Sequence, residues 1–202
     1  MIGVETLDRL IDRTYIVSRI SLWVAGAFMI ATVFMVGAEV VLRKFGSGLV
    51  TGASEVGGYM LATCSVWAFS YTLLTRSNIR FDVFYLYCGP RLRAALDFLG
   101  LLVLGVFIAA VTYYSFDVLA TSIRFGAQST SSLAVPLWLP QSVWVAGLVF
   151  LCWTILTLAV RVFVALLRQD LDTVARLAGS ANASRRFEHS AVAVPGHGES
   201  EH

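Results

Sequence analysis

Apolar residues gather in four long windows along the chain, and charged residues are almost absent from them. The windows cover approximately residues 20–42, 55–75, 95–121 and 136–160. A helix needs about 20 mostly apolar residues to cross a hydrocarbon core about 30 Å thick, so each window is long enough. The windows are apolar all round and do not alternate, which argues against barrel strands. This pattern predicts an all-α integral membrane protein with four transmembrane helices.

The first 19 residues combine charge with a helical apolar pattern. The apolar positions are spaced as on one face of a helix: Val4, Leu7, Leu10, Ile11 and Tyr15. Two interpretations fit equally well: an amphipathic segment, residues 1–19, lying on the inner leaflet, or a helical extension of the first span. We treat this segment as separate from a transmembrane domain at residues 20–178.

The third and fourth windows carry further signals. The third helix is expected to begin after Pro90 and to continue toward Ser122. About 30 residues at 1.5 Å per residue make about 45 Å, so this helix should tilt or protrude from the bilayer. The fourth helix should continue beyond Arg161 to about residue 178. Residues 179–202 are small, polar or charged and are predicted to form a disordered cytoplasmic tail.

Composition agrees with a membrane location, and the positive charges predict an orientation. The 202 residues are 57% hydrophobic and only 14% charged. Twelve of the 15 Lys and Arg residues lie before residue 20, between 75 and 94, or from Arg161 onward. Positive charge marks cytoplasmic loops, so both termini and the loop at 75–94 should be cytoplasmic. In that loop Arg76, Arg91 and Arg93 should fix topology and meet phospholipid headgroups, each contributing about 1 kcal/mol.

Charged residues near the ends of the windows are the candidates for interactions. Glu39 and Arg43 are four residues apart and can pair on one helix face. Glu55 opens the second window, where it either complements the helix dipole or pairs with Arg43 or a partner subunit. Arg93 and Asp97 should form an exposed pair of little energetic value.

Catalytic and cofactor motifs are missing from the sequence. All three histidines lie in the last fourteen residues, and the three cysteines form no CxxC pair. The chain has no P-loop, HExxH, GxSxG or dinucleotide-binding motif. We therefore expect no enzyme activity, no metal or other cofactor, and no nucleic-acid partner.

Several short motifs together resemble one transporter family. They are Val41-Leu42-Arg43, Glu55, Asn78-Ile79-Arg80-Phe81-Asp82, and Pro136-Leu137-Trp138-Leu139-Pro140-Gln141. With four spans and both ends inside, the chain resembles the small membrane subunit of tripartite ATP-independent periplasmic (TRAP) transporters, the DctQ-like family. The resemblance covers about residues 10 to 165. The family commonly has Val where this chain has Phe81.

The resemblance implies a non-catalytic subunit in a bacterial inner membrane. A periplasmic binding protein would deliver an organic acid to a large multi-span permease subunit, which imports it with sodium. The small subunit would brace this elevator-type permease and help to dock the binding protein. The resemblance suggests these residues as interface or structural candidates: Arg43, Glu55, Arg80, Asp82, Pro136, Trp138, Pro140 and Gln141.

Other membrane proteins share parts of this pattern. One alternative is a membrane anchor of a redox complex, although no histidine is available inside the spans for haem. A second is the small subunit of tricarboxylate-type tripartite transporters. A third is a self-sufficient small transporter or channel, which the uncharged centres of the spans disfavour.

Overall fold

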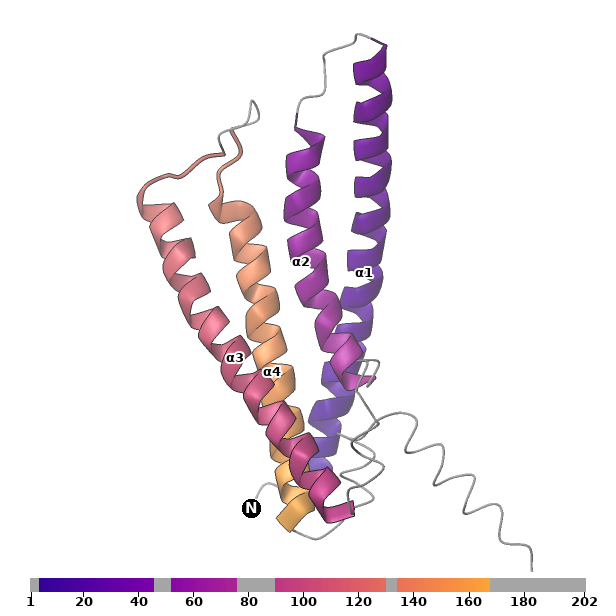
Figure 1. Cartoon of the computed structure of the whole chain (residues 1–202), viewed down its shortest axis with the longest axis vertical. Coiled ribbons are helices and arrows are strands. Elements are labelled where there is room, and N and C mark those ends of the chain that lie inside the picture. The colour runs from indigo at the N-terminus through magenta and orange to yellow at the C-terminus, as the bar shows by residue number, and fades with distance from the viewer. Residues whose placement is uncertain (1–3, 46–51, 76–89, 130–133, 168–202) are drawn as a thin grey trace, which may run out of the picture.

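The computed structural model consists of four helices, and it describes residues 4–45, 52–75, 90–129 and 134–167. The helices are α1 (Val4–Lys44), α2 (Ala53–Leu74), α3 (Pro90–Arg124) and α4 (Trp138–Leu167). They run alternately up and down and lie closest together at the end that holds the N-terminus (Figure 1). The predicted extension beyond Leu167 and the tail at 179–202 lie outside the described residues.

α1 is one continuous helix of 41 residues, and it includes the N-terminal segment. At 1.5 Å per residue it is about 62 Å long, about twice the thickness of the hydrocarbon core. The helical extension is therefore the alternative that matches the structure. α3 has 35 residues and ends at Arg124, two residues beyond the predicted end.

α4 is the central helix of the arrangement. It packs against α1, α2 and α3, while α1 also packs along α2. The order across the molecule is α1, α2, α4, α3, so the helices form an open layer and not a closed bundle (Figure 1). Within the most apolar stretch of each helix, 44% of α4 is buried against 17% of α1 and of α3.

The interface between α3 and α4 follows a seven-residue pattern. Buried positions on α4 are spaced alternately four and three residues apart: Leu151, Ile155, Leu158, Val162 and Ala165. On α3, Ala94, Leu101 and Ile108 are each seven residues apart and belong to the same core cluster. This spacing keeps one seam of each helix toward its partner, as in antiparallel helical bundles.

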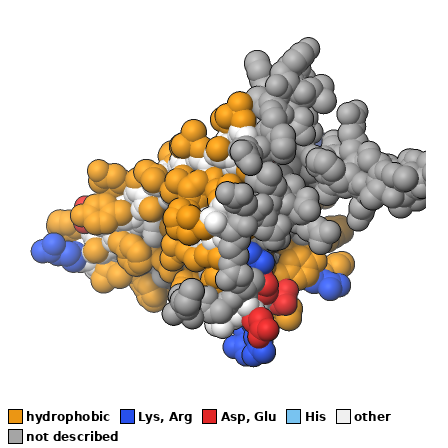
Figure 2. All heavy atoms as spheres, turned by 90° about the horizontal axis from the view of Figure 1, so that it is seen from below, with side chains coloured by type: hydrophobic (Ala, Val, Ile, Leu, Met, Phe, Trp, Pro, Cys, Tyr) orange, Lys and Arg blue, Asp and Glu red, His pale blue; other side chains and the backbone are white. Residues whose placement is uncertain are grey.

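Three helices are long and apolar enough to cross a membrane by length and composition: α1 from Glu5, α3 from Ala94, and α4. α2 is not among them, because small and polar side chains interrupt its apolar residues. Examples are Gly57, Gly58, Ser65 and Ser70. The outer surfaces are strongly apolar, with Trp23, Phe34 and Tyr113 each more than 70% exposed. Figure 2 shows hydrophobic side chains over most of the described surface on one side, with charged groups at its margins.

Candidate functional site

The contact between α2 and α4 is built around a tryptophan lying against a glycine. The indole N–H of Trp67 on α2 donates a hydrogen bond to the carbonyl oxygen of Val143 on α4, 3.1 Å away. A Cβ built on Gly147 would lie 2.8 Å from Trp67 Nε1, so only glycine leaves room for the ring. The ring also stacks on Phe150, with centroids 5.8 Å apart. These contacts hold the two helices at one fixed position.

Glycines also lie at the α1–α2 and α3–α4 interfaces, but not every helical glycine lies at an interface. A Cβ on Gly57 would lie 3.5 Å from Val36 on α1, and one on Gly105 would lie 3.1 Å from Ile155 on α4. A Cβ built on any of four other helical glycines would meet no atom within 4 Å: Gly26, Gly37, Gly58 and Gly100. Of these seven glycines, Gly57, Gly105 and Gly147 lie against a neighbouring helix.

An ion pair joins the beginning of α1 to the last part of α4. Arg161 Nε on α4 lies 2.7 Å from Asp8 Oδ1 on α1, and the Arg161 side chain is only 11% exposed. Sequence reasoning assigned Arg161 to topology and did not foresee this partner. The two residues are 153 positions apart, so no local spacing signals the contact.

The charged candidates at the opposite end are held mainly by local contacts. Arg43 Nη2 lies 2.6 Å from Glu39 Oε1, and the Glu39 side chain is buried while that of Arg43 is 71% exposed. Tyr59 donates a hydrogen bond of 2.6 Å to Glu55 Oε1. Ser129 lies close enough to interact with the Tyr59 hydroxyl, which brings α2 next to the segment before α4.

The Pro-Leu-Trp turn, as we call residues 127–129 and 134–137, is held together by backbone pairing between these two short segments. Ser129 N–H donates to Val135 O at 2.9 Å, and Leu137 N–H donates to Ala127 O at 3.0 Å. Pro136 forms an antiparallel bridge with Gln128 within this turn. The carbonyl of Pro136 accepts a bond from Leu139 N–H at 3.2 Å, which begins the first turn of α4. The motif thus fixes where α4 starts.

The other motif residues lie around the start of α4. Trp138 is 43% exposed. Pro140 lines an apolar groove between α1, α2 and α4. Among the described residues, the side-chain oxygen Oε1 of Gln141 is buried and has no hydrogen-bond partner.

One expectation about charge was wrong. Asp97 on α3 is 4% exposed, so it belongs to the buried part of the structure and not to an exposed pair. It lies on the α4-facing seam, three residues after Ala94 and four before Leu101, which explains its burial. A buried carboxylate needs a partner, and Asp97 has one.

Most of the basic loop lies outside the described residues. Arg76, Arg80 and Asp82 are outside the described residues, so their predicted roles are untested. Arg91 and Arg93 lie in the first turn of α3, but their side chains are also not described.

The described residues hold no group of three or more His, Cys, Asp or Glu side chains suited to a metal ion. The site is thus a set of helix contacts and an apolar groove. Comparison with known families decides what kind of protein this is. The model for the DctQ component of tripartite ATP-independent periplasmic transporters matches residues 29–165. The chain belongs to the DctQ family.

The match to the DctQ family includes all of α2 and α3, most of α4, and the part of α1 from residue 29 onward. It contains the Trp67–Gly147 contact and the Pro-Leu-Trp turn, whereas Asp8 lies before it. No curated protein and no solved structure matches the chain. The expected resemblance is confirmed, and this DctQ protein belongs to a family of transporter components.

Proposed function

We propose that this DctQ protein is the scaffold subunit of a sodium-driven TRAP transporter for an organic acid. It would lie in a bacterial inner membrane and brace the large elevator-type permease subunit. A periplasmic binding protein would deliver the substrate. The observation that carries the proposal is the family match over residues 29–165, on a structure with strongly apolar outer faces.

The composition of the helix centres supports a bracing role. No Asp, Glu, Lys or Arg occurs between Arg19 and Glu39 on α1, or after Glu55 on α2. The same holds between Asp97 and Asp117 on α3, and from Trp138 to Val160 on α4. Ionisable groups within a membrane usually mark ion or proton pathways. A subunit without them at mid-helix is better suited to holding a partner than to coupling an ion itself.

We include α2 as a fourth span with both termini in the cytoplasm. Its 22 residues make a helix of about 33 Å, enough to cross a 30 Å core. It runs beside α1 and α4 through the same layer (Figure 1). Because part of α2 faces these neighbouring helices and not lipid, the helix can contain smaller and more polar residues and still span the bilayer.

The proposed periplasmic edge would help to dock the binding protein. It comprises the segments Arg43 to Glu55 and Arg124 to Trp138, which meet through Tyr59, Glu55 and Ser129. The Arg43 side chain is 71% exposed. We expect it to meet an acidic group on the binding protein.

Co-purification tests the proposed assembly. The tagged full chain is co-expressed with the large permease subunit of its transporter and extracted in mild detergent. We expect the two to elute together in a fixed ratio, and Arg43→Ala to keep that ratio while weakening capture of the binding protein. The proposal fails if the chain elutes as a monodisperse monomer without the large subunit.

A further inference from the structure

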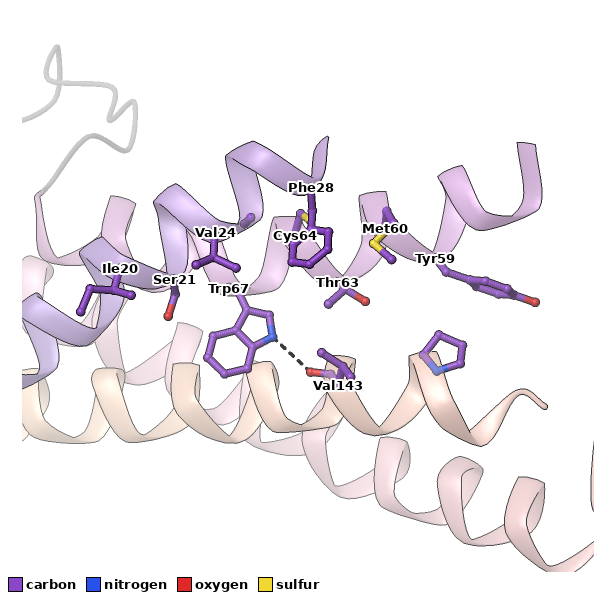
Figure 3. Close-up of a pocket in the computed structure, with 12 residues that line it drawn as sticks. Ile20, Ser21, Val24, Phe28, Tyr59, Met60, Thr63, Cys64, Trp67 and Val143 are labelled. Atoms are coloured by element: carbon purple, nitrogen blue, oxygen red, sulfur yellow. Dashed lines mark hydrogen bonds between the residues drawn. The ribbon is translucent and has the colours of Figure 1, made fainter. Parts of the chain in front are cut away.

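An apolar groove lies between α1 and α4, with α2 as its floor (Figure 3). Its volume is about 430 Å³, which is within the usual range of small-molecule sites. α1 contributes Ile20, Val24 and Phe28 to its wall, and α2 contributes Thr63, Cys64 and Trp67. α4 closes it at Pro140 and Val143.

Three of the polar groups in the wall of the groove already form hydrogen bonds within the protein. The hydroxyl of Ser21 donates to Val17 O at 2.9 Å, within α1. The indole N–H of Trp67 donates to Val143 O, and the Tyr59 hydroxyl donates to Glu55. Among the residues that the structure describes, no charged side chain lines the groove. An organic acid would lose its hydration there without gaining partners, so the groove is suited to a hydrocarbon ligand.

The dimensions of the groove favour a chain molecule over a protein helix. It extends from Ile20 to Phe28 on α1 and from Tyr59 to Trp67 on α2, about 12 Å at 1.5 Å per residue. On α4 it covers a single turn, from Pro140 to Val143. A spanning partner helix would pack over about 30 Å. A flexible acyl chain can fill a short hollow, and the bilayer supplies acyl chains in large excess.

A positive charge and two tyrosines lie at one end of the groove. Arg19 directly precedes Ile20, and it is close enough to Tyr71 for electrostatic interaction. Tyr71 pairs with Tyr15, with ring centroids 5.7 Å apart. Arginine binds phosphate through paired N–H donors, and tyrosine is enriched at the headgroup level of membranes. Charge complementarity therefore points to an anionic headgroup beside the groove.

We propose that this groove binds one glycerophospholipid, with an acyl chain against Trp67 and the headgroup phosphate at Arg19. The lipid would belong to the leaflet on the side of the N-terminus. It would fill the hollow between α1 and α4, which these two helices do not close themselves. The inference depends on the helices lying in a bilayer, and not on the transport function.

Native mass spectrometry of the purified full chain tests the proposal. The detergent-washed protein is titrated with palmitoyl-oleoyl phosphatidylglycerol, and separately with the phosphatidylcholine of the same chains. Val24→Trp fills the groove from α1, where Val24 is 49% exposed. Val33→Trp is the matched control, on another face of α1 and 67% exposed. Arg19→Gln removes the headgroup charge, with Arg9→Gln as its control.

We expect one tight phosphatidylglycerol per wild-type chain. Val24→Trp should weaken binding of both lipids at least about tenfold, and Val33→Trp should leave it unchanged. Arg19→Gln should weaken phosphatidylglycerol about fivefold and phosphatidylcholine less. If circular dichroism shows that Val24→Trp is not folded, the comparison of Arg19→Gln with Arg9→Gln tests the proposal instead.

Two results would overturn the proposal. Equal lipid binding by Val24→Trp and Val33→Trp would mean that lipid surrounds the helices without occupying the groove. A wild-type complex with the large subunit that carries no lipid, and whose assembly Val24→Trp blocks, would mean that a protein side chain fills the groove.

Discussion

Trp67 lies so close to Gly147 that a single methyl group cannot be added between them. The nearest ring atoms would be 2.8 and 2.9 Å from a Cβ at position 147, and Val66 on the same helix would be 3.1 Å away. An indole held by a hydrogen bond and a stacking contact cannot easily move aside. This contact determines how closely α2 approaches α4.

Gly147→Ala should therefore destabilise the protein despite the higher helix propensity of alanine. Overpacking typically costs about 1–3 kcal/mol. Unfolding in mixed detergent micelles, followed by circular dichroism, measures the loss. Gly100→Ala is the control, because nothing lies within 4 Å of a Cβ there, and it should be neutral or stabilising. Equal stability of the two variants would refute the close contact.

Trp67→Phe should have a smaller effect, because it removes the N–H donor to Val143 but keeps an aromatic ring. Hydrogen bonds between membrane helices contribute about 0.6 kcal/mol on average and at most about 1.7 kcal/mol. Trp153→Phe, at a 48% exposed position on α4, should leave the free energy of unfolding unchanged. A loss at Trp153 as large as that at Trp67 would argue that general aromatic packing, and not this bond, is measured.

Breaking the pair between Asp8 and Arg161 should loosen the end where α1 meets α4. Asp8 is half exposed, so we expect Asp8→Asn to cost only about 1 kcal/mol. Asp12→Asn, one turn further along α1, is the control. A double-mutant cycle with Arg161→Gln isolates the pair. Additive effects of the two substitutions would show that the residues do not interact in solution.

Tyr59→Phe should release the segment before α4 from α2. The substitution removes the hydroxyl that binds Glu55 Oε1 and interacts with Ser129. Amide hydrogen exchange should become faster at Ser129 and Leu137, whose N–H groups form the turn. Tyr113→Phe on α3 removes an exposed hydroxyl and should change neither amide. Unchanged exchange in Tyr59→Phe would mean that the backbone bonds alone hold the turn.

The helices could be predicted from the sequence because their signal is local. Apolar windows of about 20 residues and the proline at position 90 place the third helix to within a few residues. The same signal is weaker for α2, because glycines, serines and threonines interrupt its apolar residues. The sequence predicted that the second window spans the membrane. Among the described helices, however, only α1, α3 and α4 are long and apolar enough to be identified as spans.

The contacts that fix the arrangement depend on the fold and could not be read from spacing. Asp97 looked exposed because it lies near a helix end, but the seam toward α4 buries it. The contact of Trp67 with Gly147, eighty residues later in the chain, has no local sequence signal. The open order of the helices also follows from long-range packing, so the groove at Val24 was not foreseen.

The central claim is that this DctQ protein braces a permease and does not itself carry substrate. Its most direct test is uptake of a radiolabelled organic acid, driven by a sodium gradient, into proteoliposomes holding the permease and its loaded binding protein. We predict sodium-dependent uptake only when the chain is co-reconstituted, and none with the chain alone. Full uptake by the permease without this chain would contradict the account.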